Sequence, residues 1–423
     1  MSDKKQDEDL GKDARSTQAL PPEERPTEDM GDEESSGEGL SSEARRELAT
    51  VLRGMEKLAR LIEQRGSFSA GAVAFKFLRV LAERSNGVQV LLFERSLPHG
   101  VGGYAVVKRL QNPSDFRRRQ RMKDEVQLAF RLHHPAIAQV HHFRVFGGVP
   151  YIIMEYVDGP QLESLLSTAA LQNKPLPAPF ALYVAAEVAD ALDYAHTRTE
   201  LEESGRPLGI IHRDVSPRNI RVGRRSGEVK LTDFGAAYSK LVGREETAGL
   251  LKKGDLLYAS PEYLRCGPMD ARADLFSLGL VLLEALTGRH LFDSEEGQVP
   301  APLAEVNVVA DEAPPLPLAR MLARVERYSP EDVERAAAGL SEGLKTLLHK
   351  VLQRDPAQRH ATAAELRGEL RAQLALLAPG YGRPQAAEEV QRLISEASAL
   401  RDVAEPVESG LYPESLDGHE LEA

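Results

Sequence analysis

The 423-residue sequence contains no tryptophan and only one cysteine, Cys266. A single cysteine excludes an intramolecular disulfide, which is typical of proteins that fold in a reducing compartment. No run of about eighteen apolar residues occurs, so the sequence offers no candidate for a membrane-spanning helix. The acidic N-terminus lacks the basic and apolar regions of a signal peptide, and we therefore expect a cytoplasmic protein.

The sequence also has fewer basic residues than acidic ones, 53 against 65. The formal net charge of −12 argues against a nucleic-acid-binding protein, whose surface would be basic. Residues 1–40 hold thirteen acidic and five basic residues with almost no large apolar side chains, so we predict a disordered acidic tail. Residues 403–423 contain no Lys or Arg and are predicted to form a second acidic tail. Such tails could bind a basic partner and, at residues 1–40, accept phosphate by autophosphorylation. Alternatively, they could serve only to keep the protein soluble.

Between the tails, the spacing of apolar residues changes along the chain. Residues 41–66 carry them at intervals of three and four, which predicts an amphipathic helix, either docked on the next domain or used for dimerisation. Strand patterns (FLRVLAE, VQVLLFE, YAVVKRL, VPYIIMEYV) then dominate residues 75–156, and helical periodicity dominates residues 157–376. Strands followed by helices predict an α+β protein with a small β-rich lobe and a larger helical lobe. A further helix is predicted at 385–402.

Five polar residues occur in an order that suits chemistry on a phosphate group. Lys108 ends an apolar strand, and Glu125 lies in a helical pattern seventeen residues later, where a carboxylate could hold the ammonium group in place. Asp214 and Asn219 lie five residues apart in HRDVSPRN, and Asp233 follows in TDFG. Asn219 and Asp233 offer the hard oxygen donors that Mg²⁺ prefers, whereas Asp214 could accept the proton of a hydroxyl group.

These motifs resemble those of the eukaryotic-type (Hanks-type) bacterial serine/threonine protein kinases over about 70% of the chain. AVVK resembles the strand lysine, DEVQLAFRLHHPAI the helix after it, and YIIMEYVDG the hinge. HRDVSPRN resembles the catalytic loop, DFG the metal-binding aspartate, and SPE the end of the activation segment. The resemblance implies a bilobal protein-kinase fold. It also implies transfer of the γ-phosphoryl group of ATP, with Mg²⁺ or Mn²⁺, to serine or threonine hydroxyls of a protein substrate.

The resemblance assigns a role to each matched residue. Lys108 would hold the α- and β-phosphates, with Glu125 as its partner. Asp214 would orient the acceptor hydroxyl, while Asn219 and Asp233 would bind the metal. The residues expected around the nucleotide are Gly87, Val106, Lys108, Met154 (as gatekeeper), Glu155, Val157 and Arg221.

Other matched positions are structural or regulatory. They are His212, Arg213, Phe234, Gly235, Thr247, Glu262, Asp274 and Arg359. Asp274 would anchor the catalytic loop, and Arg359 would pair with Glu262. A phosphate on Thr247 would add negative charge that could pair with Arg213, which predicts activation by phosphorylation, unless Thr247 is simply a solvated loop residue.

The nucleotide pocket departs from the family pattern at three places. Gly87 is the only glycine where three are usual, so fewer bare backbone N–H groups can fold over the phosphates. Val106 replaces a small alanine. Arg221 stands where a leucine usually lies beneath the adenine. Its stem could lie flat with the guanidinium in solvent, or the side chain could fill the slot itself.

A fourth departure lies in the catalytic loop. Ser216 replaces the lysine that steadies the γ-phosphate, and Asp255 replaces a threonine that bridges to the activation segment; Lys252 or Lys253 could restore the missing charge. Every residue expected to touch metal and phosphate is nevertheless present. The sequence thus favours an active kinase with weak nucleotide affinity over its alternative, a pseudokinase that acts as a binding or allosteric scaffold.

Overall fold

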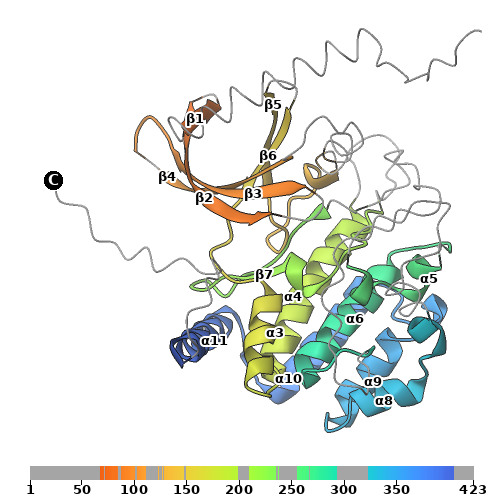
Figure 1. The fold of residues 1–423 in the computed structure, drawn as a ribbon. Coiled ribbons are helices and arrows are strands. Elements are labelled where there is room, and N and C mark those ends of the chain that lie inside the picture. Colours follow the sequence, from red (N-terminus) through yellow and green to blue (C-terminus); the bar gives the residue numbers. More distant parts are fainter. Residues whose placement is uncertain are drawn as a thin grey trace, which may run out of the picture. The chain divides into compact units, whose positions relative to one another are not determined.

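The structure, a computed structural model, describes most of the chain between residues 67 and 403 (Figure 1). Within that range, the description leaves out residues 71, 84–86, 101, 111–121, 123–125, 127, 147–148, 199–208, 235–236, 238–254, 266 and 293–322. The first predicted acidic tail, the helix predicted at 41–66 and all of the second tail except Val403 lie outside the described residues.

The N-terminal part is a six-stranded sheet in which every neighbouring pair of strands is antiparallel, in the order β1-β2-β3-β4-β6-β5. Its strands are β1 (Ser67–Ala70), β2 (Val73–Glu83), β3 (Val88–Ser96), β4 (Gly102–Leu110), β5 (Val140–Phe146) and β6 (Val149–Glu155). The sheet therefore begins before the predicted boundary at residue 75. The short β1 pairs with β2, and Phe68 stacks on Phe75 with ring centroids 4.9 Å apart, which explains why this segment belongs to the domain.

Alternation along the strands separates two apolar layers. On β4, Ala105 and Val107 join an aromatic-rich cluster with Phe75 and Phe93. The intervening residues point to the opposite face, where Leu110 belongs to the main hydrophobic core. Because Lys108 has the parity of Leu110, the strand directs its side chain toward that second face and the chain segments that follow the sheet.

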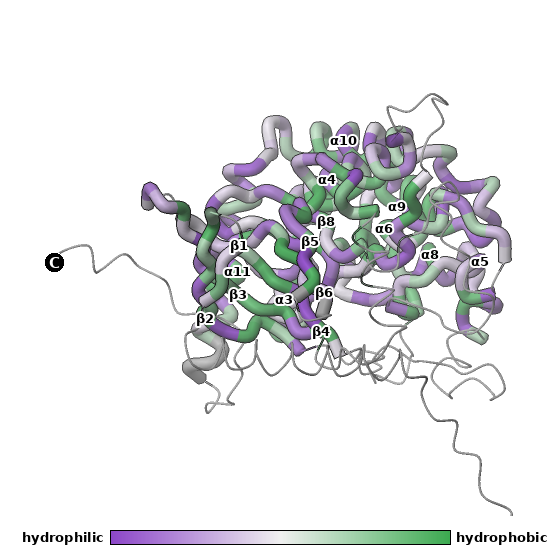
Figure 2. The backbone as a smooth tube through the Cα atoms, turned by 90° about the horizontal axis from the view of Figure 1, so that it is seen from above, coloured by the Kyte–Doolittle hydropathy of each residue, from purple (hydrophilic) through white to green (hydrophobic). Residues whose placement is uncertain are grey.

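The C-terminal part is mostly helical. Its elements are α3 (Leu162–Leu171), α4 (Ala178–Thr197), η1 (Pro217–Asn219), β7 (Ile220–Val222), β8 (Val229–Leu231), η3 (Leu256–Tyr258), α5 (Pro261–Leu264), α6 (Arg272–Thr287), α8 (Pro330–Ala336), α9 (Glu342–Val351), η4 (Pro356–Gln358), α10 (Ala363–Leu377) and α11 (Arg383–Val403). Helix α6 is buried nearly all round, as expected of a helix at the centre of a core. Figure 2 shows apolar stretches where α4 and α6 pass through this part of the molecule.

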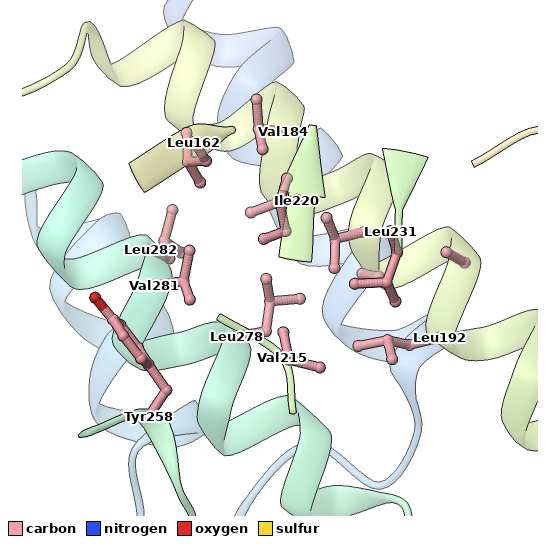
Figure 3. Close-up of a cluster of buried hydrophobic side chains, with 14 of the residues drawn as sticks. Leu162, Val184, Leu192, Val215, Ile220, Leu231, Tyr258, Leu278, Val281 and Leu282 are labelled. Atoms are coloured by element: carbon pink, nitrogen blue, oxygen red, sulfur yellow. The ribbon is translucent and has the colours of Figure 1, made fainter. Parts of the chain in front are cut away.

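The core of the helical part also fixes the loop that carries HRDVSPRN. Side chains from α3, α4, α6, β7 and β8 meet in one cluster, and Val215 and Ile220 point into it (Figure 3). Both are almost fully buried. Since these two apolar residues bracket the polar residues of the loop, their burial holds the loop in one place against α6.

Helix α11 extends over the stretch predicted as a separate helix at 385–402 and packs into the same core through Val390. Its start lies against the turn at Gly227, where φ is 61° and an added Cβ would meet the Arg383 carbonyl oxygen at 1.9 Å. Only glycine fits this approach. None of the helices in the described part of the chain is both long and apolar enough to cross a membrane.

Candidate active site

Lys108 and Asp233 are brought together from different parts of the chain. Lys108, in β4, is 5% exposed, and its Nζ lies 3.2 Å from Asp233 Oδ1. Asp233 follows β8 and has a φ of 67°, a left-handed conformation that is uncommon outside glycine and often found at functional sites. Each buried charge is compensated by the other. Glu125, the predicted partner of Lys108, lies outside the described residues.

Asp274, in the first turn of α6, holds the 212–219 loop by its main chain. Its carboxylate accepts hydrogen bonds of 2.8 Å from the backbone N–H groups of His212 and Arg213, and a third of 2.8 Å from His196 Nε2. Burial alone would raise the pKa of Asp274, but these hydrogen bonds and the nearby histidines outweigh it, and the pKa lies below its usual value. An ionised Asp274 thus anchors the loop, as the sequence led us to expect.

The His212 ring links this loop to the segment that contains Asp233. Burial lowers the pKa of His212, so the ring is neutral. Its Nδ1 accepts from the Asp214 N–H at 3.2 Å, which leaves Nε2–H to donate to the Thr232 carbonyl at 3.1 Å. The ring also contacts Phe234 edge-on, with centroids 4.5 Å apart. Asp214 and Asp233 are therefore held in a fixed relation through one imidazole.

Asp214 is held by donors from two segments. Asn219 Nδ2 donates to both the backbone oxygen and Oδ2 of Asp214 at 2.8 Å, and the Asp255 N–H donates to Oδ1 at 2.7 Å. Burial raises the pKa of Asp214 to about 7, and the carboxylates of Asp233 and Asp255 act in the same direction, against the two donors. A carboxylate with a pKa near neutrality can act as a proton acceptor.

This pKa predicts how pH affects stability. An unfolded aspartate titrates near 3.9, so between about pH 4 and 7 the ligand-free folded chain keeps a proton on Asp214 that the unfolded chain has released. The contribution of Asp214 to the free energy of unfolding should therefore be largest below pH 4 and fall as the pH rises through 7. Because Asp214→Asn cannot ionise, its stability relative to the original protein should rise by roughly 2 kcal/mol between pH 5 and 8.

Urea denaturation of both proteins at the two pH values measures this difference. Changes in hydrogen bonding caused by the substitution itself cancel in the comparison, since they are present at both pH values. An unchanged difference between pH 5 and 8 would mean that Asp214 ionises like an ordinary surface aspartate.

The position where the resemblance expects a lysine is closed to solvent. Ser216 is 1% exposed, and its hydroxyl has no hydrogen-bond partner within the described parts of the chain. Lys252 and Lys253, the predicted sources of replacement charge, lie outside those parts. Arg218 brings a positive charge to this loop, and its Nη2 lies 2.7 Å from Asp255 Oδ2. Sequence reasoning missed Arg218, because its partner is distant in the sequence.

The end of β6 and the segment after it are linked to the β7–β8 hairpin by two side chains. Arg221, half-buried in β7, donates from Nη1 to the Gly159 carbonyl at 2.8 Å. Lys230, in β8, lies 2.7 Å from the carboxylate of Glu155. The guanidinium of Arg221 is therefore attached to the chain after β6. Which of the two sequence-based alternatives applies to its stem stays a prediction.

The remaining residues expected around the nucleotide lie on the sheet and the same connecting segment. Val106 is half-buried and faces Met154 across the β4–β6 pair. Val157 is buried after β6. Gly87 precedes β3 with a φ of 75°, a conformation that glycine adopts without strain.

Arg359 and Glu262 form the ion pair expected from the sequence. Arg359 Nη1 and Nη2 lie 2.7 and 2.9 Å from the two carboxylate oxygens, and the guanidinium stands 4.7 Å from the centre of the Phe276 ring. The remaining donors of Arg359 bind backbone carbonyls. Gly235 and Thr247 lie outside the described residues, so the predicted activation site at Thr247 stays a prediction.

The donor set suits a phosphate-bound Mg²⁺. Asn219 commits its Nδ2 to Asp214, which turns its Oδ1 away and leaves an amide oxygen for another ligand. Asp233 supplies a carboxylate beside Lys108. Within the described residues, no cluster of three or more His, Cys, Asp or Glu side chains could hold a metal alone. One carboxylate and one amide oxygen, completed by phosphate oxygens, is a set that Mg²⁺ uses.

Comparison with known proteins shows that the chain is similar to protein kinases. The family described as "Protein kinase domain" matches residues 98–369. Serine/threonine-protein kinase PknB of Mycobacterium tuberculosis is 36% identical over 255 residues, which cover 59% of this chain and 35% of PknB. PknJ of the same organism is 32% identical over 306 residues, which cover 70% of this chain and 45% of PknJ.

A third relative has a different name. "Tyrosine-protein kinase MasK" of Myxococcus xanthus is 33% identical over 292 residues, which cover 67% of this chain and 42% of MasK. The chain thus spans less than half the length of these curated relatives. Among solved structures, the crystal structure of the Mycobacterium tuberculosis PknI kinase domain matches with 24% identity and a TM-score of 0.48, over 73% of this chain and 98% of that one.

Proposed function

The chain belongs to the protein kinase family, and we propose that it transfers the γ-phosphoryl group of ATP to serine or threonine hydroxyls of a protein substrate. The observation that carries this proposal is the setting of Asp214. Its carboxylate is held by Asn219 and the Asp255 N–H, on a loop tied through His212 to the segment of Asp233. Lys108 reaches the same place from the sheet. Kinase chemistry needs four polar side chains together, here those of Lys108, Asp214, Asn219 and Asp233.

Each residue has a distinct task in this proposal. Mg²⁺-ATP, when bound, supplies the transferable phosphoryl group and much of the charge that must be balanced. Lys108 would bind phosphate oxygens, and Asp233 and Asn219 would hold the metal. Asp214 would accept a hydrogen bond from the acceptor hydroxyl and take its proton, which its raised pKa favours. Because no covalent bond to the protein forms, catalysis would consist of positioning and electrostatic stabilisation.

We expect nucleotide affinity to be weak. Val106 and Arg221 flank the place proposed for the base, and Gly87 is the only glycine of the loop proposed to cover the phosphates. Losses of this kind act on binding in the ground and transition states alike, so they raise KM without lowering kcat.

The second candidate function is a pseudokinase scaffold. The attachment of Arg221 to the Gly159 carbonyl favours it, since this contact commits the guanidinium to the protein's own backbone. In that case the site would be retained for the fold, and the chain would act by binding other proteins. The acidic tails would serve a basic partner in either case.

The decisive experiment combines thermal unfolding with a transfer assay. At about a hundred times its Kd, Mg²⁺-ATP should stabilise the protein by roughly 2.7 kcal/mol, and labelled γ-phosphate should appear on protein acceptors. Omitting the metal is the control. Because one relative is called a tyrosine kinase, acid hydrolysis of the labelled product should identify which hydroxyl carries the phosphate. If millimolar ATP with Mg²⁺ or Mn²⁺ neither stabilises the protein nor yields labelled product, the scaffold function is correct.

A further inference from the structure

The catalytic loop lacks a lysine at Ser216 but has a cation nearby. Arg218 lies two residues later, on the outer side of η1, where it meets the carboxylate of Asp255 from the end of the activation segment. We propose that Arg218 is a positioning residue, an inference that rests on the function proposed above. Its ion pair with Asp255 holds the Asp255 N–H against Asp214 and thereby fixes the orientation of the catalytic carboxylate.

The argument starts from the contacts of Asp255, which is held on three sides. Its N–H donates to Asp214 Oδ1 at 2.7 Å, its Oδ2 lies 2.7 Å from Arg218 Nη2, and its Oδ1 accepts from the Leu257 N–H at 3.2 Å. The Asp255 side chain is 4% exposed. A change in the direction of this carboxylate would turn the attached backbone, and the N–H that reaches Asp214 would move with it.

The contacts form a closed cycle. Asp214 accepts from Asp255, Asp255 binds Arg218, and Arg218 is followed directly by Asn219, whose amide returns to Asp214. The short helix η1 separates the two side chains, with Asn219 buried on one side and Arg218 one-third exposed on the other. Proline at the first position of η1 fixes its backbone. Removing Arg218 breaks this cycle at the contact between Arg218 and Asp255, which is the one ion pair in the cycle.

Charge balance gives a second, independent reason for Arg218. The carboxylates of Asp255 and Asp233 both lie near enough to Asp214 to disfavour its charge, and like charges in a buried site repel one another. Arg218 neutralises Asp255 and also lies 3.9 Å from Glu163 of α3. Without the guanidinium, the buried Asp255 carboxylate would be uncompensated and would be driven toward solvent, away from the geometry that serves Asp214.

The test uses Arg218→Ala, Arg218→Lys and Asp255→Asn in the full chain. We expect Arg218→Ala to lower kcat roughly tenfold to a hundredfold, because a misplaced catalytic group costs rate, with little change in the KM for ATP or acceptor. Arg218→Lys should restore part of kcat. Arg218→Ala combined with Asp255→Asn should be no worse than the first change alone, since both remove one interaction. Arg335→Ala, which breaks an exposed ion pair on α8, is the matched control.

A second measurement does not depend on catalysis. Hydrogen–deuterium exchange at the Asp255 amide should be slow in the original protein and clearly faster in Arg218→Ala, but unchanged in Arg335→Ala. Unchanged exchange overturns the inference, as does an additive double variant. A rise confined to the KM of the acceptor also overturns it, because Arg218 would then contact substrate. Should the original protein transfer no phosphate, the proposed function fails, and amide exchange alone decides whether Arg218 positions Asp255.

Discussion

Replacement of Lys108 by methionine is expected to slow phosphate transfer at least about a hundredfold and to remove most of the stabilisation by Mg²⁺-ATP. Loss of one preorganised charge in such a site typically costs a factor of about 10²–10³. Lys108 is buried beside Asp233, so the variant would also leave the charge of Asp233 to oppose the incoming phosphates. Methionine has a similar length and suits the buried strand position, and we therefore expect the fold to persist. The measurements are kcat/KM and the ATP-dependent shift in Tm.

Lys76→Met is the matched control. Lys76 lies in β2 of the same sheet, its side chain is 70% exposed, and its contact with Glu94 is long at 3.9 Å. An exposed pair of this kind contributes little, so both transfer and the ATP-dependent shift should be unchanged. If Lys108→Met kept more than about a tenth of the original transfer rate, Lys108 could not be the phosphate-binding lysine.

The order of the strands and helices and the family could be predicted because both depend on short-range patterns in the sequence. Alternation marks the strands, three-to-four spacing marks the helices, and motifs such as AVVK and TDFG lie at characteristic intervals. The family match confirms the expected family and the expected protein-kinase fold. The start of the domain was harder to predict. Strand β1 lies before residue 75 and belongs to the sheet because Phe68 stacks on Phe75 across a hairpin.

Contacts between distant segments were harder to predict. The apolar spacing at 385–402 indicates a helix, but its docking depends on the close approach of Arg383 to Gly227, which no periodicity records. One partner of Arg221 is the backbone carbonyl of Gly159, and a contact with a backbone atom cannot be recognised from the pattern of side chains in the sequence. For this reason the sequence left two orientations open for the guanidinium.

The charge near the 212–219 loop illustrates the same limit. The absence of a lysine at Ser216 is visible in the sequence, and Lys252 and Lys253 are natural substitutes because they precede Asp255. The structure shows Arg218 against Asp255, and Lys252 and Lys253 lie outside the described residues. Arg218 belongs to the same motif as Ser216, but its function depends on where a residue thirty-seven positions away is placed. Spacing along the sequence does not predict this contact, because ion pairs form between segments that the fold brings together.

The ion pair between Arg359 and Glu262 should have the largest effect on stability. Arg359 is completely buried, Glu262 nearly so, and the two carboxylate oxygens each receive a hydrogen bond from the guanidinium. In Arg359→Ala, Glu262 would be left as an uncompensated buried charge, and three backbone carbonyls would lose a donor. Breaking a buried pair in this way costs about 3–5 kcal/mol. Urea denaturation, analysed at constant m, measures the change in free energy of unfolding.

Two comparisons separate this pair from ordinary surface charge. Arg335→Ala removes an exposed pair with Asp332 and should change stability by less than about 1 kcal/mol. Joint replacement of Arg359 by Met and Glu262 by Gln should be less destabilising than Arg359→Ala, because no unpaired charge then remains and Met can still cover the Phe276 ring. Glu262 belongs to α5, which follows Asp255 closely in the chain, so the loss in Arg359→Ala should also loosen the region that holds Asp255. A cost for Arg359→Ala as small as that of Arg335→Ala would show that Glu262 finds water or another cation, and that the pair does not support this part of the fold.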